Sequence, residues 1–129
     1  MIYTSYYDNL KNINADIYAP IGISGWIPDN YVGARYIPLA PKLAIYKEYV
    51  QTHDTNQYTK RYKEEVLAKR NINKVVCDLF MLADSKIPVL LCYERPELFC
   101  HRKLVAHWLI SNGFYTLELD YENDKTKGE

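Results

Sequence analysis

The stretch from Cys92 to Arg102 concentrates side chains that could do chemistry. Its eleven residues hold two thiols, two carboxylates, two guanidinium groups and one imidazole (Cys92, Glu94, Arg95, Glu97, Cys100, His101 and Arg102). An apolar run, residues 87–91, precedes the stretch, and an amphipathic helical pattern follows it. In open α/β sheets, ligands bind beyond the carboxyl ends of strands, where helix N-termini present free N–H groups. The stretch therefore predicts a substrate or anion site without naming its reaction.

Three of these residues are candidates for catalysis. Glu94 at a strand end could act as acid, base or nucleophile, or it could form only a cap or a salt bridge. Cys100 lies at a helix N-terminus, which favours the thiolate, although most free cysteines are small buried hydrophobes. His101 falls on the buried face of the predicted helix, where it could donate a proton or simply bind a backbone carbonyl. This spacing lets the three side chains converge with Arg102 and leaves His107 out.

Seven residues are candidates for substrate binding. Arg102 and Arg95 could clamp a phosphate or carboxylate, because a guanidinium group pairs bidentately with oxyanions. Alternatively, Arg102 pairs with Glu94 or Glu97 and only holds the loop. Residues from a long loop rich in glycine and proline could contact a base or a sugar. The full set is Arg102, Arg95, Cys92, Tyr93, Ser24, Trp26 and Tyr36.

Zinc is an alternative use of the same side chains. Cys92, Cys100 and His101 could supply three ligands, and the fourth would come from Glu94, Glu97 or His53. However, the spacing matches none of the paired-cysteine motifs of zinc sites. Neighbouring Cys and His residues on a helix also rarely face one ion. We therefore predict no metal ligand and no cofactor, with zinc as the alternative.

Composition limits the classes of protein to which the chain can belong. The 129 residues are 48% hydrophobic and 25% charged, which predicts one globular domain over residues 1–121 and a charged, flexible tail over 122–129. Sixteen basic and sixteen acidic residues give zero net charge, which argues against generic DNA binding through phosphates. Three cysteines, no leader and no membrane-length apolar run predict a reduced, cytoplasmic protein, either a monomer or a homodimer. Abundant Asn, Lys, Ile and Tyr hint at the AT-rich genome of a bacterium or phage.

The order of predicted elements indicates an α/β fold. Strands are expected over residues 1–7, 17–23, 88–94 and 114–121, and helices over 42–51, 55–70, 75–83 and 99–111. Thr55 or Asn56 should cap the second helix, and the third is apolar over so wide an arc that it should be well covered. The continuous apolar run in the third strand is typical of a central parallel strand. We predict a three-layer α/β domain with a mostly parallel sheet of about four or five strands flanked by helices.

The chain also resembles a known family. Residues 89–94, which end in Leu-Cys-Tyr-Glu, and residues 99–102, Phe-Cys-His-Arg, resemble the domain-of-unknown-function 488 family. The resemblance implies a small bacterial, archaeal or phage α/β protein that is suspected of enzymatic activity. It also implies that the functional positions are Cys92, Glu94, Cys100, His101 and Arg102. Many members carry an arginine near the second strand, where this chain has none, so Arg35 is the loop residue that could replace it.

Three hypotheses follow for function. The first is a small enzyme, hydrolase-like, acting on a nucleotide, a nucleic-acid end or another phosphate-bearing substrate; in a glycosidic hydrolysis, Glu94 would stabilise the developing positive sugar. The second is a non-catalytic module that binds an anion or a protein, in a regulatory or phage counter-defence role. The third is a thiol redox protein, which requires the sulfurs of Cys92 and Cys100 to come within bonding reach.

Overall fold

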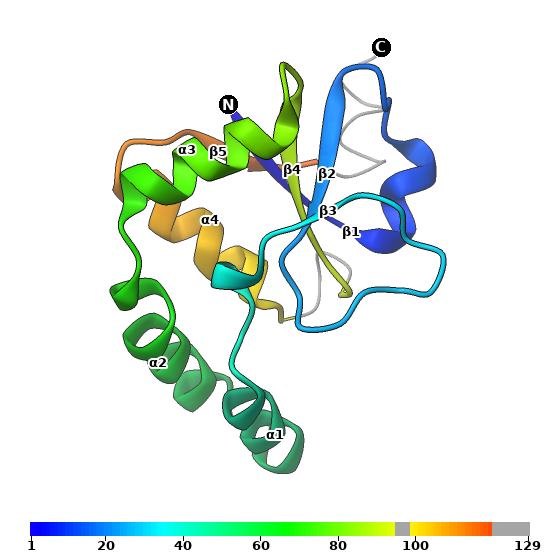
Figure 1. The fold of residues 1–129 in the computed structure, drawn as a ribbon. Helices are drawn as coiled ribbons and strands as arrows, with labels where there is room; N and C mark the ends of the chain where they lie inside the picture. Colours follow the sequence, from blue (N-terminus) through cyan, green and yellow to red (C-terminus); the bar gives the residue numbers. More distant parts are fainter. Residues whose placement is uncertain (95–98, 120–129) are drawn as a thin grey trace.

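A computed structural model describes residues 1–94 and 99–119 of the chain (Figure 1). Its strands are β1 (Ile2–Tyr6), β2 (Tyr18–Gly22), β3 (Ala34–Arg35), β4 (Ile87–Cys92) and β5 (Thr116–Glu118). Its α-helices are α1 (Leu43–Thr52), α2 (Thr55–Glu65), α3 (Ile72–Ala83) and α4 (His101–Ser111). Three short 3-10 helices join them: η1 (Tyr7–Asn12), η2 (Ile37–Leu39) and η3 (Leu67–Lys69).

The five strands form one sheet in the order β3-β2-β4-β1-β5, and every neighbouring pair is parallel. Strand β4 lies at the centre, where Val89 is opposite Tyr3 of β1 and Leu90 is opposite Ile21 of β2. All of β4 after Ile87 is buried, because neighbouring strands and both faces of the sheet cover it. The predicted parallel sheet and central apolar strand are thus confirmed.

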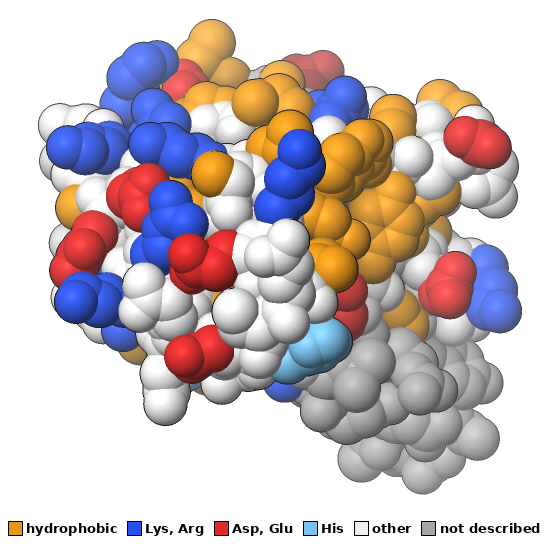
Figure 2. All heavy atoms as spheres, turned by 90° about the horizontal axis from the view of Figure 1, so that it is seen from below, with side chains coloured by type: hydrophobic (Ala, Val, Ile, Leu, Met, Phe, Trp, Pro, Cys, Tyr) orange, Lys and Arg blue, Asp and Glu red, His pale blue; other side chains and the backbone are white. Residues whose placement is uncertain are grey.

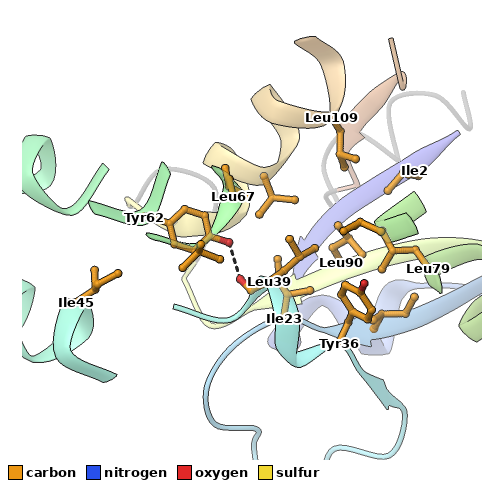
Figure 3. Close-up of a cluster of buried hydrophobic side chains, with 14 of the residues drawn as sticks. Ile2, Ile23, Tyr36, Leu39, Ile45, Tyr62, Leu67, Leu79, Leu90 and Leu109 are labelled. Atoms are coloured by element: carbon orange, nitrogen blue, oxygen red, sulfur yellow. Dashed lines mark hydrogen bonds between the residues drawn. The ribbon is translucent and has the colours of Figure 1, made fainter. Parts of the chain in front are cut away.

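Different layers cover the two faces of the sheet. Helices α3 and α4 pack against one face, and α2 packs against α4 (Figure 1). The main core lies between them, and there the Tyr62 hydroxyl donates a 2.5 Å hydrogen bond to the Leu39 carbonyl (Figure 3). On the other face, η1 and the loop after β2 bring Tyr7 and Tyr31 against Val89. The predicted three-layer α/β fold is therefore confirmed.

The helices differ from the predicted ranges mainly at their ends. Asp54 caps α2, because its carboxylate accepts the backbone N–H of Gln57, so the predicted caps at Thr55 and Asn56 are wrong. Helix α2 also stops at Glu65, short of residue 70, and η3 follows it. The C-terminus of α4 agrees with the prediction.

Helix α3 is less covered than its composition suggested. Val75, Leu79 and Ala83 are buried, but Phe80 and Met81 are exposed, Met81 by 73%. The prediction of full coverage was wrong because one face of α3 packs on β2 and β4 and the opposite face has no layer above it among the described residues. None of the described helices combines the length and the apolar character that crossing a membrane requires.

The segment predicted as one long loop, residues 25–41, contains two short elements. Strand β3 adds two residues to the edge of the sheet, where Ala34 lies opposite Ile21. Helix η2 follows and buries Leu39 in the main core. Strand β3 and helix η2 anchor the segment between the edge of the sheet and α1, and Leu43, Tyr46 and Tyr49 of α1 form part of the site described next.

Candidate functional site

A pocket of about 300 Å³ lies beyond the carboxyl ends of β2 and β4. The segment after β2 forms one side, α1 and α2 form another, and the residues from the end of β4 to the start of α4 form the rest. The described lining residues are Ser24, Gly25, Trp26, Pro41, Leu43, Tyr46, Tyr49, Tyr58, Glu94, Phe99, Cys100 and His101. Seen from below, hydrophobic side chains gather over a broad area of the molecular surface, with most charged side chains to one side (Figure 2). The position agrees with the sites of open parallel sheets.

Aromatic rings form most of the pocket wall. Trp26 meets Tyr46 edge to face, with ring centroids 5.4 Å apart. Phe99 contacts both Tyr49 and Tyr58, at centroid distances of 5.6 Å and 5.2 Å. Trp26 is 56% exposed, so its ring has free surface for a ligand. Rings of this kind stack on planar groups such as nucleobases and on the apolar faces of sugars.

Glu94 is the only formally charged residue among the described lining residues. Burial raises the pKa of the Tyr58 hydroxyl well above its usual value, and the negative charge of Glu94 raises it further. Glu94 and Tyr58 both line the pocket, and Glu94 is exposed to solvent. An aromatic cavity with one carboxylate favours a ligand that carries or develops positive charge.

His101 is held as a neutral imidazole at the base of the pocket. Its Nε2 lies 2.7 Å from the Ile23 carbonyl, which can only accept, so Nε2 carries the proton. Burial lowers the pKa of His101 to about 4, and the positive charge of Arg102 also lowers it, while the Ile23 hydrogen bond opposes the shift. The unprotonated Nδ1 lies 3.8 Å from Cys100 Sγ. The predicted role of proton donor therefore does not fit this setting, and Nδ1 is placed to accept.

Arg102 is fully buried, and each of its three nitrogens donates a hydrogen bond within the protein. Its Nε and Nη2 donate to the two carboxylate oxygens of Glu118, both at 3.1 Å. Its Nη1 lies 3.0 Å from Cys92 Sγ and also donates to the Glu94 carbonyl. Arg102 thus joins β5, the end of β4 and α4. This setting differs from the predicted oxyanion clamp, because Arg102 is not among the described residues that line the pocket.

The two cysteines of the stretch are joined. A disulfide links Cys92, the last residue of β4, to Cys100, the N-cap of α4. The expectation that all cysteines are free thus holds only for Cys77, which is exposed. Cys92, Cys100 and His101 offer metal-ligating atoms within 4.8 Å of one another, so the zinc alternative has three of its four ligands together. His53 does not belong to this group and packs against Tyr49.

The other predicted binding residues lie in different places. Ser24 and Trp26 line the pocket, and the Ser24 hydroxyl bonds the Tyr7 hydroxyl at 2.7 Å and the Trp26 carbonyl. Tyr93 is half exposed outside the pocket, with its ring 5.0 Å from that of Tyr7. Tyr36 is buried away from the pocket and donates to Asp78 at 2.7 Å. The predicted roles of Arg95 and Glu97 fall on residues outside the described ranges.

Sequence reasoning missed two parts of the site. The first is the wall that Tyr46, Tyr49 and Tyr58 provide. The spacing of three between Tyr46 and Tyr49 places both rings on one face of α1, and this was the available signal. The second is Glu118, the partner of Arg102, which comes from another strand and had no local signal.

Residues 4–113 match a protein family named DUF488-N3a, which is described as the active DUF488-N3 subclade. The chain belongs to the DUF488-N3a family. The match covers most of the chain and includes every element that lines the pocket, so the resemblance to the DUF488 family is confirmed. Comparison of this family member with curated proteins and with solved structures gave no match.

Proposed function

We propose that this chain is an enzyme that hydrolyses the glycosidic bond of a nucleoside or nucleotide. The observation that carries the proposal is the aromatic pocket in which Glu94 supplies the only formal charge among the described lining residues. Cleavage of a glycosidic bond develops positive charge on the sugar, and a carboxylate stabilises that charge or attacks the sugar carbon. Trp26 and Tyr46 would hold the leaving base by stacking.

The same observation argues against chemistry at phosphorus. A phosphoryl group carries negative charge in the transition state and needs cations or metal ions around it. The described pocket wall offers a carboxylate instead, and the guanidinium group of Arg102 is bound to Glu118. A phosphate on the substrate would therefore lie outside the pocket. The exposed Arg35, whose Nη2 donates to the Gly25 carbonyl at 3.0 Å, is beside the pocket and could bind it.

Water would complete the reaction, and we expect His101 to help. Its Nδ1 can accept a hydrogen bond from a water molecule in the pocket, because Nε2 is fixed as the donor to Ile23. A neutral imidazole is also compatible with the apolar wall. In this scheme Glu94 stabilises the sugar, the aromatic rings hold the base, and His101 orients the nucleophile.

The test is release of free base from a panel of nucleosides and 5′-nucleotides, followed by chromatography. We expect Glu94→Gln to lower kcat/KM by at least about 100-fold. Glu64→Gln, a carboxylate exposed on α2, is the matched control and should behave like the parent. Arg35→Ala should raise KM for a nucleotide and leave the corresponding nucleoside unchanged. Equal turnover by Glu94→Gln and the parent would refute the assignment.

The non-catalytic binding module is the competing function, and the same panel separates the two. A compound that raises the melting temperature without being consumed would support a binding module and contradict hydrolysis. Occupation of the Arg102 donors by Glu118, Cys92 and the Glu94 carbonyl already weakens the anion-binding form of that hypothesis.

A further inference from the structure

The two bonded sulfurs have different surroundings. Cys100 lines the aromatic pocket, whereas Cys92 is 1% exposed and is not among the lining residues. Cys100 is also the N-cap of α4, an eleven-residue helix whose first N–H groups favour a negative charge there. One sulfur is therefore accessible from a ligand cavity, and the other lies behind it.

Each sulfur also has a polar neighbour that suits a thiol or thiolate. The Nδ1 of His101 lies 3.8 Å from Cys100 Sγ and can accept a hydrogen bond from the reduced thiol. The Nη1 of Arg102 lies 3.0 Å from Cys92 Sγ, where its positive charge stabilises a thiolate. Structural disulfides need neither neighbour. Thiol redox chemistry requires two sulfurs within bonding reach, and Cys92 and Cys100 meet this requirement. Each sulfur also has a neighbouring group that stabilises its reduced form.

We infer that Cys100 and Cys92 form a redox-active pair that exchanges with small disulfides admitted to the aromatic pocket. Cys100 is the attacking thiol and Cys92 is the resolving thiol. This activity goes beyond glycosidic hydrolysis and does not require Glu94. A large protein disulfide is excluded as substrate, because Cys100 is only 4% exposed and is reached through the pocket.

The small disulfide is itself the oxidant, so the exchange of thiols and disulfides needs no other one. The Cys100 thiol loses its proton to solvent, and the thiolate attacks one sulfur of a small disulfide RSSR; the bond between the two RSSR sulfurs breaks, and RS⁻ leaves and takes a proton from solvent to become RSH. The Cys92 thiolate then attacks Cys100 in the mixed disulfide, and the second RS⁻ leaves with the Cys92 proton. Two electrons pass from the cysteines to RSSR. The products are two RSH and the Cys92–Cys100 bond.

The test uses full-length protein with Cys77→Ser, so that the exposed third thiol is silent. Reduced protein is mixed with 2-hydroxyethyl disulfide, quenched in acid and weighed by mass spectrometry. We expect the Cys77→Ser protein to lose two hydrogens without a lasting adduct. With Cys92→Ser added, one mercaptoethanol adduct should remain on Cys100, formed about tenfold faster than in the urea-unfolded chain. With Cys100→Ser added instead, Cys92 should gain no adduct while folded.

A second measurement keeps the inference falsifiable if a serine variant fails to fold. Brief iodoacetamide labelling of the reduced Cys77→Ser protein, read by peptide mapping, should modify Cys100 before Cys92. The inference is overturned if the reduced protein never forms the bond, if Cys92 is the faster thiol, or if no adduct forms on folded Cys92→Ser protein. Zinc retained in native mass spectrometry with both thiols reduced would also overturn it, because the sulfurs would then be ligands.

Discussion

Replacing Arg102 with methionine tests whether its buried ion pair holds the site together. Methionine keeps an unbranched apolar chain in place of the arginine stem and removes the charge and every donor. The Glu118 carboxylate would lose both of its 3.1 Å hydrogen bonds, and Cys92 Sγ and the Glu94 carbonyl would each lose one. Leaving one partner of a buried pair behind costs about 3–5 kcal/mol.

The lower end of that range applies here. The side chain of Glu118 is 24% exposed, so water reaches it, and the Thr4 hydroxyl still donates to it at 2.7 Å. We therefore expect the free energy of unfolding to fall by about 3 kcal/mol. An unfolding entropy of about 2.1 cal/mol/K per residue gives roughly 270 cal/mol/K for the whole chain. The same loss therefore lowers the melting temperature by about 11 °C.

Circular dichroism during heating measures this shift, and two further variants control it. Adding Glu118→Gln to Arg102→Met removes the unpaired charge and should recover part of the loss. Arg61→Met removes a second arginine that binds a glutamate through two nitrogens, but on the surface of α2, so its shift should be clearly smaller. Equal shifts for Arg102→Met and Arg61→Met would refute the reasoning.

Three further outcomes are expected. The pKa of His101 is about 4 when folded and about 6.5 when unfolded, so its contribution to stability is complete above about pH 6.5 and falls by about 3 kcal/mol as the pH drops to 4. The free energy of unfolding, measured with urea between pH 4 and pH 6.5, should therefore depend less on pH in His101→Gln than in the parent. An identical pH dependence in the two proteins would contradict the lowered pKa of His101. Trp26→Ala should raise KM for the cleaved nucleoside about tenfold through lost stacking, while Tyr115→Ala, an exposed aromatic outside the pocket, should not; equal KM values would exclude Trp26 from the site. Tyr62→Phe should lower the free energy of unfolding by about 1–2 kcal/mol because the Leu39 carbonyl loses its donor, and an unchanged melting temperature would argue against this bond.

Local patterns predicted the elements around the site. The apolar run before Glu94 was enough to predict a buried central strand, because a strand covered on both faces needs no polar alternation. Helical spacing also placed His101 on the face of α4 that is buried, together with Val105 and Leu109. These inferences depend on neighbours within a few residues, and such neighbours are visible in the sequence.

The sequence by itself determined the parallel α/β fold, the family and the position of the polar stretch between β4 and α4. Only the tertiary structure decided what each side chain in that stretch faces. Arg102 faces inward because Glu118 arrives from a strand sixteen residues later, and the charge of Glu94 acts on the pKa of Tyr58 because α2 packs on α4. The physical reason is that the charge and accessibility of a group depend on all the atoms around it, and most of those atoms come from distant parts of the chain.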